Sequence, residues 1–311
     1  MQGLLAVYRK ELADHLGSRR FIILFVLICL AGLSSVYVAG QSIRNEVSDA
    51  RNVFLLLFTS SSGALPPFFT FIGFLGPLVG LALAFDSVNG EMNRGTLSRL
   101  LAQPIYRDAV INGKFLAGLT TVTLMLTAIT VIVSALGILV IAVIPTPAEL
   151  LRLLVFLIIC ILYVGFWLAL STMFSVLLRQ TTTAALAGIA SWIFLTFFVT
   201  MIADAIANAL VMTVDVFDIN ALLRLEALRQ MLARISPNTL FQEATVAMLM
   251  PKVRTLGPIL FTQAIGMLPN PLSVRESVLL IWPHAVGMFA LTCICFAIAY
   301  VRFMVQEIRS L

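Results

Sequence analysis

A polar, charged segment, residues 86–114, interrupts two long apolar runs and carries side chains that could do chemistry. Within it, Glu91, Arg94 and Arg99 offer ion pairs and hydrogen bonds to another protein, and Gly95 allows that protein to approach the backbone closely. We expect binding and not catalysis, because no serine–histidine or paired-aspartate constellation occurs in the chain at the spacing of a span centre. The segment therefore predicts a surface that binds another protein.

Other chemistries lack their motifs in this sequence. Nucleotide hydrolysis uses a GxxxxGK[ST] loop, but Gly113-Lys114 is followed by Phe115 and lacks the upstream glycine, so we expect no ATPase activity and no catalytic residue. The two histidines, His15 and His284, are far apart, and no CxxC, HxxxH or HExxH pattern occurs, which predicts no metal site. The four cysteines lie within apolar runs, where they fit helix packing better than disulfides.

The composition places this chemistry in a membrane. Of the 311 residues, 60% are hydrophobic and only 11% are charged, whereas soluble domains carry about 25% charged residues. The formal net charge of +5 does not indicate nucleic acid binding, because many lysines and arginines lie beside apolar runs, as the positive-inside rule predicts.

Six apolar runs are long enough to cross the hydrocarbon core as helices of about 20 residues. They predict an all-α polytopic membrane protein in which residues 1–311 form a single transmembrane domain. The predicted spans cover about 21–40, 66–85, 115–144, 152–178, 184–211 and 277–304.

Three segments outside the spans also have helical periodicity. Residues 1–20 predict an amphipathic helix on the membrane surface, since one face is apolar and the other is charged. In the cytoplasmic segment 86–114, a helix is expected over Glu91–Ala102, ending at Gln103-Pro104. The extracytoplasmic region 212–276 predicts helices over 219–235 and 238–250.

The distribution of Lys and Arg in the short segments predicts six spans with both termini in the cytoplasm. Eleven positive residues would then lie inside and three outside, with the long 212–276 region left out of the comparison. Those inside are Arg9, Lys10, Arg19, Arg20, Arg94, Arg99, Arg107, Lys114, Arg179, Arg302 and Arg309, and those outside are Arg44, Arg51 and Arg152.

The run GPLVGLALAFDSVNGEMNRGTLSRLLAQPIYRDAVINGKFLAG, residues 76–118, resembles the signature of the type-2 ABC transporter permease family. Its most telling residues are Asp86, Gly90-Glu91, Arg94-Gly95-Thr96-Leu97, Pro104, Arg107 and Gly113-Lys114, preceded by Arg9-Lys10-Glu11-Leu12. Within the family the chain resembles NosY-like permeases, which also carry an Asn-Pro or Ser-Pro motif late in the outer loop; Ser236-Pro237-Asn238 is similar.

The resemblance implies that residues 86–114 are similar to a coupling helix that docks in a groove on a separate ABC ATPase subunit. ATP and Mg would be bound by that partner, and this chain would need no cofactor of its own. Two permease chains would pair, as a homodimer or with a related chain, and two ATPases would join them in a prokaryotic cell membrane. The implied ATPase contacts are Glu91, Arg94, Gly95, Thr96, Leu97, Arg99 and Leu100, with Arg9, Lys10 and Glu11 of the N-terminal helix.

Candidates for the transport path or the dimer contact lie in the second and fifth spans. Gly76, Gly80 and Ala84 form a small-xxx-small row with Gly73 nearby, which favours a helix-packing seam over substrate contact. Asp204 is the one acidic residue in the fifth apolar run, near its predicted outer end.

The function that the resemblance implies is ATP-driven export of a substrate that the sequence does not identify. One alternative is a membrane platform of a maturation or assembly complex, which would dock an extracytoplasmic partner on 212–276. A second is an ATP-independent secondary transporter, which should show buried mid-membrane charges or an inverted repeat; neither is evident.

Overall fold

The computed structural model describes residues 2–46, 53–60, 66–142, 144–211, 219–250 and 272–306. Every regular element within these ranges is helical. Six of the helices are long and apolar enough to cross a membrane: Arg19–Gln41, Phe68–Asn93, Arg107–Val140, Pro147–Leu177, Thr181–Leu210 and Val274–Val305. The predicted all-helical class is thus confirmed, with six candidate spans, whereas its orientation across the membrane stays a prediction.

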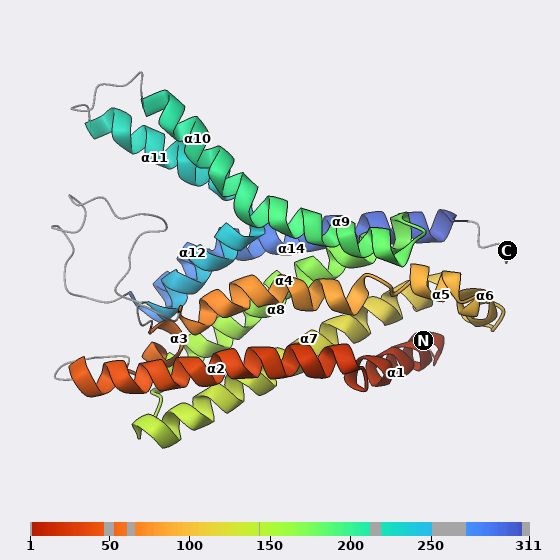
Figure 1. Cartoon of the computed structure of the whole chain (residues 1–311), viewed down its shortest axis with the longest axis horizontal. Coiled ribbons are helices and arrows are strands. Elements are labelled where there is room, and N and C mark those ends of the chain that lie inside the picture. The colour runs from red at the N-terminus through yellow and green to blue at the C-terminus, as the bar shows by residue number, and fades with distance from the viewer. Residues whose placement is uncertain are drawn as a thin grey trace.

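The long helices run roughly side by side (Figure 1). They are α2 (Arg19–Glu46), α4 (Phe68–Ala84), α7 (Arg107–Ile141), α8 (Pro147–Leu177), the continuous run of α9 (Thr181–Ile193), the π-helix η2 (Phe194–Phe198) and α10 (Val199–Val211), and α14 (Val274–Val305). The shorter ones are α1 (Gln2–Leu16), η1 (Val53–Leu55), α3 (Leu56–Thr59), α5 (Asn89–Asn93), α6 (Thr96–Leu101), α11 (Ile219–Ala233) and α12 (Pro237–Leu249).

Both chain termini lie at the same end of the bundle, together with α1, α5 and α6 (Figure 1). We call this the terminal end, and the end that holds α3 the opposite end. The shared position of the termini follows from an even number of spans. It places the segment predicted to bind a partner beside the N-terminal helix.

Helix α8 forms the centre of the bundle, packing against α14, α4, α7 and α12. Phe156, Tyr163 and Trp167 are fully buried along it. Its sequence is apolar on all sides, as expected of a helix surrounded by others. Helices α4, α7 and α14 thus pack directly on α8, whereas α2 packs on α7 and α4.

The small residues of α4 allow it to pack closely on its neighbours. A Cβ atom added at Gly80 would lie 2.8 Å from the backbone nitrogen of Leu168, and one added at Gly73 would lie 2.5 Å from Gln242 Nε2 of α12. Gly76 faces Val164 in the same way, and Ala84 is buried. All four candidates thus occupy contacts within the chain, and their role in a transport path stays a prediction.

Several helices begin before the apolar run does. Helix α7 starts at Arg107, although the sequence predicts a span from about 115. Helix α8 starts at Pro147 because Thr146 forms a capping box with Glu149, and α14 starts at Val274 because Ser273 does so with Glu276. Capping and ion pairing allow these helices to begin in polar sequence, which a prediction from hydropathy alone would leave outside the spans.

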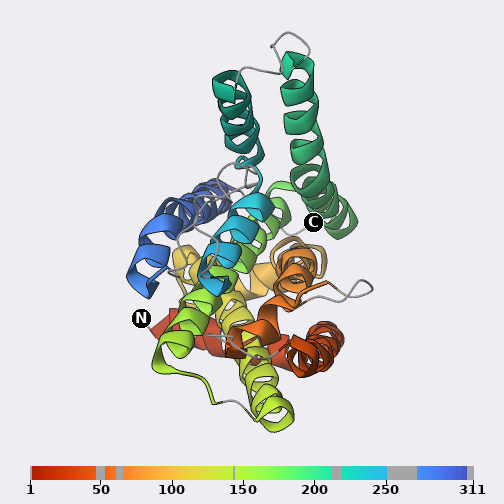
Figure 2. The same cartoon turned by 90° about the vertical axis from the view of Figure 1, so that its left-hand side faces the viewer.

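The region predicted as extracytoplasmic contains two helices in the described residues, α11 and α12, while 212–218 and 251–271 lie outside them. Helices α10 and α11 form a hairpin that extends away from the bundle (Figure 2). Arg229 of α11 donates to Asp204 of α10 at 2.6 Å and so ties the hairpin together. Helix α12 instead packs into the bundle against α14, α8 and α4.

Candidate functional site

The segment at the terminal end is two short helices, so the prediction of one helix over Glu91–Ala102 is wrong. Helix α5 ends at Asn93 and α6 begins at Thr96. Between them, Gly95 has φ of 66°, in the left-handed region that glycine adopts without steric cost. The glycine therefore breaks the helix and turns α6 away from α5.

Around this turn, one side of the segment is exposed and the other is buried. Arg94, Gly95, Thr96 and Arg99 are exposed, whereas Leu97 is buried among apolar residues of α1, α7 and α14. Leu100 is half-buried against the same cluster. A docking partner would thus meet the exposed edge, while Leu97 fixes the segment to the bundle.

Polar contacts hold the start of α5 to the end of α8. The backbone nitrogens of Val88 and Asn89 donate to Ser175 Oγ at 3.0 and 3.3 Å, and the Asn89 amide donates to the carbonyl of Leu178 at 3.3 Å. These buried groups leave little freedom for α5 to move independently of the central helix.

A buried ion network joins three helices beneath the exposed edge. Lys114 Nζ of α7 lies 2.8 Å from Glu11 Oε1 of α1 and 2.9 Å from Glu91 Oε1 of α5. The side chain of Lys114 is 3% exposed and those of both glutamates are 10% or less. Lys10, half-exposed, contacts the same two carboxylates at 2.8 and 3.2 Å. The predicted site residues Lys10, Glu11 and Glu91 therefore form one unit.

Electrostatic contacts within this network favour the charged forms of Glu11 and Lys10. Burial alone would raise the pKa of Glu11, but Lys114 and Lys10 outweigh it and hold that pKa below its ordinary value of 4.5. Burial would lower the pKa of Lys10, yet hydrogen bonds and attraction from Glu11 and Glu91 raise it above 10.5. Within the described residues, Glu91 Oε2 is buried without a hydrogen-bond partner.

The Gly113-Lys114 pair has a role that sequence reasoning missed. A Cβ atom at Gly113 would lie 2.9 Å from Val7 Cγ1 and 3.3 Å from the backbone nitrogen of Tyr8, so only glycine allows α1 to approach α7 this closely. The next residue, Lys114, then reaches Glu11. The sequence signal that could have indicated this role is a single lysine, Lys114, directly before an apolar run.

A polar hollow of about 360 Å³ lies beside this network, between α1, the start of α2, the end of α4 and α5. At its edge Arg20 donates to Asp86 at 2.9 Å, and its guanidinium lies 4.8 Å above the Phe85 ring. This ion pair ties the start of the first span to the end of the second.

Two further predicted residues lie apart from the network. Arg9 is exposed on α1, on a part of the surface that a docked partner could reach. Asp204 belongs to the α10–α11 hairpin and pairs with Arg229, whose pKa is raised chiefly by that hydrogen bond. A role for Asp204 in a transport path stays a prediction.

The opposite end holds polar contacts that sequence reasoning also missed. Glu243 of α12 accepts from Arg234 at 2.8 Å and lies 2.7 Å from His284 Nε2 of α14. Burial alone would raise the pKa of Glu243, but His284 and Arg234 lower it below 4.5. The guanidinium of Arg152 donates to the Met248 carbonyl at 2.9 Å and to Ser277 Oγ at 3.1 Å, binding α8 to α12 and α14.

Comparison with known proteins agrees with this architecture. The chain matches the family described as ABC-2 family transporter protein over residues 5–308. It is 33% identical over 110 residues to the probable ABC transporter permease protein NosY of Pseudomonas aeruginosa, and 29% identical over 109 residues to the protein of that name from Stutzerimonas stutzeri. Each of these two matches covers 35% of this chain and only 36% of the relative. Because the family match extends over nearly the whole chain, the protein belongs to the ABC-2 family of transporter proteins.

Proposed function

We propose that this chain is the transmembrane permease subunit of an ATP-driven exporter and docks α5 and α6 on a separate ABC ATPase subunit. The observation that carries the proposal is the exposed edge formed by Arg94, Gly95, Thr96 and Arg99 on a segment anchored to the spans. Family membership supports it, because the chain matches transporter proteins over residues 5–308. ATP and Mg would bind to the partner, where hydrolysis would occur.

The anchoring contacts suggest how the partner's movement reaches the spans. A displacement of α5 would act on α7 through Glu91 and Lys114, and on α8 through Asn89 and Ser175. Helix α1 would follow, because Glu11 binds the same lysine. Such a chain of buried, paired groups transmits displacement better than a solvated loop, which would absorb it.

The complex would contain two copies of the permease and two ATPases, with the transport path between the permeases. The fifth span supports this arrangement, because it exposes large apolar side chains over much of its length. These include Ile189, Phe194, Phe197, Phe198, Met201, Ile202 and Ile206. A second copy of the chain would cover part of this surface and the bilayer the rest.

The test is co-purification of the permease with a candidate ABC ATPase subunit produced in the same cells. Arg94→Glu combined with Arg99→Glu reverses two exposed charges without touching the buried network, so we expect loss of the bound ATPase and of permease-stimulated ATP hydrolysis. Arg275→Glu, an exposed arginine at the opposite end, is the matched control and should leave both unchanged. Unaltered binding and stimulation in the double variant would contradict the proposal.

A second candidate function is a platform that docks an extracytoplasmic protein. It is favoured by the α10–α11 hairpin, which extends from the bundle and exposes Met231, and by the exposed Ile235 in the turn that follows α11. The full-length chain would be used to capture partners from solubilised membranes, with Met231→Glu and Ile235→Glu as the negative control. Capture of the same proteins by both forms would exclude this role for the hairpin.

A further inference from the structure

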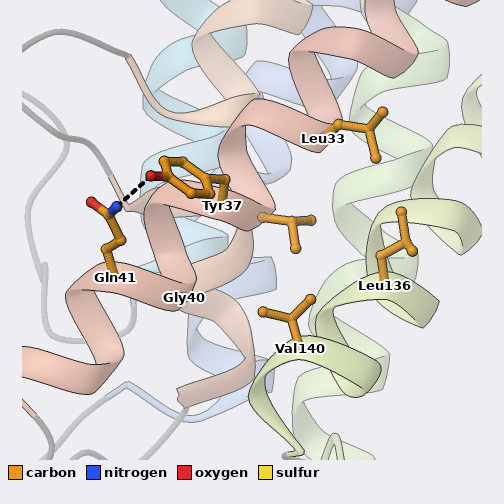
Figure 3. A pocket seen from close by; sticks show the side chains of 7 residues that line it. Leu33, Tyr37, Gly40, Gln41, Leu136 and Val140 are labelled. Carbon is orange, nitrogen blue, oxygen red and sulfur yellow. Dashed lines mark hydrogen bonds between the residues drawn. The ribbon is translucent and has the colours of Figure 1, made fainter.

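A groove of about 470 Å³ lies between α2 and α7 toward the opposite end of the bundle. Leu33, Val36, Tyr37, Gly40 and Gln41 line it from α2, and Leu136 and Val140 line it from α7. Side chains from the two helices face one another across it (Figure 3). Its volume falls within the range of about 300–1,000 Å³ that small-molecule sites occupy.

The groove is a consequence of sequence spacing. Leu33, Tyr37 and Gly40 are separated by four and three residues, which places them on one face of α2. Gly40 contributes no side chain, and a Cβ atom there would lie 3.2 Å from Val140 Cγ1. A larger residue at this position would therefore occupy the space between the helices.

The groove opens to the outside of the bundle. Leu33, Tyr37 and Val140 are 42%, 66% and 51% exposed. Both walls belong to helices that qualify as membrane spans, and the groove continues into exposed apolar residues on each, such as Leu30 and Leu139. A bilayer around these spans would cover this surface and bring hydrocarbon into contact with the groove.

A polar pair marks one end of the groove. Gln41, the last residue of the first span, donates its side-chain amide to the Tyr37 hydroxyl at 2.7 Å. Within the described part of the chain no acceptor takes the proton of that hydroxyl, so it is available to a ligand. Tyrosine is enriched where a span meets the headgroup region, because its ring is apolar and its hydroxyl is polar.

We propose that this groove binds a phospholipid, with one acyl chain between α2 and α7 and an ester or phosphate oxygen accepting the Tyr37 hydroxyl proton. The apolar walls match the chain, and the polar pair at the end of the span matches the glycerol–phosphate region. The groove lies away from α5 and α6, so the proposal is independent of ATPase docking.

The test uses the full-length protein in nanodiscs that contain phosphatidylcholine with a diazirine on one acyl chain, a few carbons from the ester. Peptide mass spectrometry after irradiation should locate the label on 33–41 and 136–140. Gly40→Leu should lower that labelling about tenfold, since it displaces roughly two methylene groups. Gly287→Leu in α14, where an added Cβ would meet only Leu240 at 3.6 Å, is the control and should leave it unchanged.

Two further variants keep the proposal falsifiable if Gly40→Leu fails to fold. Val140→Trp blocks the groove from its exposed wall and should lower labelling similarly. Tyr37→Phe keeps the ring and removes the donor, so it should reduce labelling about fivefold. Label distributed evenly over the exposed faces of α2 and α7, or unchanged by the blocking variants, would overturn the proposal.

Protection of the groove by a second copy of the chain would also overturn it, and inter-chain cross-linking through Tyr37→Cys would reveal that copy.

Discussion

Lys114 shows how a single residue decides the structure of the terminal end. It is buried with both of its carboxylate partners, and these come from α1 and α5. Taking three charged groups out of water is costly, and the mutual attraction offsets that cost only while all of them are present. The network therefore contributes less to net stability than to the specific placement of α1 and α5 on α7.

Removing this cation should be strongly destabilising. Lys114→Ala leaves Glu11 and Glu91 buried with only the half-exposed Lys10 nearby, and we expect a loss of about 3–5 kcal/mol. Thermal and chemical unfolding of the purified protein would measure it. Arg9→Ala, at an exposed position on α1, should change stability by less than about 0.5 kcal/mol. A loss in Lys114→Ala no larger than that of the control would contradict this account.

Glu243 should make the opposite end sensitive to acid. Its folded pKa lies below its ordinary value of 4.5, so its contribution to stability is complete above that value. The contribution is lost as the pH falls through the folded pKa, because protonation then weakens the contacts with His284 and Arg234. Unfolding midpoints measured from neutral pH to about pH 3 should fall less steeply in Glu243→Gln than in the unaltered protein. If the midpoints of the two proteins fell equally steeply with pH, Glu243 would not be the cause of the acid sensitivity.

At the scale of elements, apolar runs predicted the six spans well but not where the helices begin. Hydropathy places the start of the third span near 115, whereas α7 begins at Arg107. The difference arises because Lys114 is neutralised by glutamates from distant segments, which the local pattern does not reveal. Gly95 shows the same limit, because a glycine can fit inside a short helix or break it, and the sequence does not reveal that its φ is 66°.

The sequence named candidate site residues without showing how they are arranged. Sequence reasoning named Glu11, Glu91 and Arg94 together, yet the structure buries the two glutamates and exposes the arginine. It gave no role to Arg152, whose partners Met248 and Ser277 lie 96 and 125 residues further along the chain. Pairings over such separations depend on how the helices pack, and a single sequence carries no record of that.

Helix α1 should depend on the absence of a side chain at Gly113. In Gly113→Ala the new methyl group would lie 2.9 Å from Val7 Cγ1 and 3.3 Å from the Tyr8 backbone, so α1 must move away from α7. We expect faster proteolysis of the N-terminal helix and weaker ATPase binding. Gly287→Ala, where the nearest contact is 3.6 Å, should behave like the unaltered protein. Equal proteolysis rates in the two variants would show that this close approach is dispensable.

At the scale of the whole molecule, the two ends of the bundle carry different kinds of polar structure. The terminal end has an ion network with an exposed basic edge, suited to a partner that binds and releases. The opposite end has the contacts of Glu243 with Arg234 and His284, together with caps and buried hydrogen bonds such as those of Glu149 and Arg152, and these fasten helices to one another. This asymmetry fits a permease that is driven from one side.

Orientation across the membrane is the prediction that connects this asymmetry to function. Lys and Arg are more numerous in the segments that the positive-inside rule assigns to the cytoplasm, and the structure places both termini with α5 and α6 at one end. Single cysteines at exposed positions would test it, in a chain whose four native cysteines are replaced by alanine. A membrane-impermeant maleimide should react with Arg275→Cys in spheroplasts, where the reagent reaches only the extracytoplasmic face of the membrane. Arg94→Cys should react only in inverted vesicles. The reverse pattern would place α5 and α6 away from any cytoplasmic ATPase and would contradict both the topology and the proposed coupling.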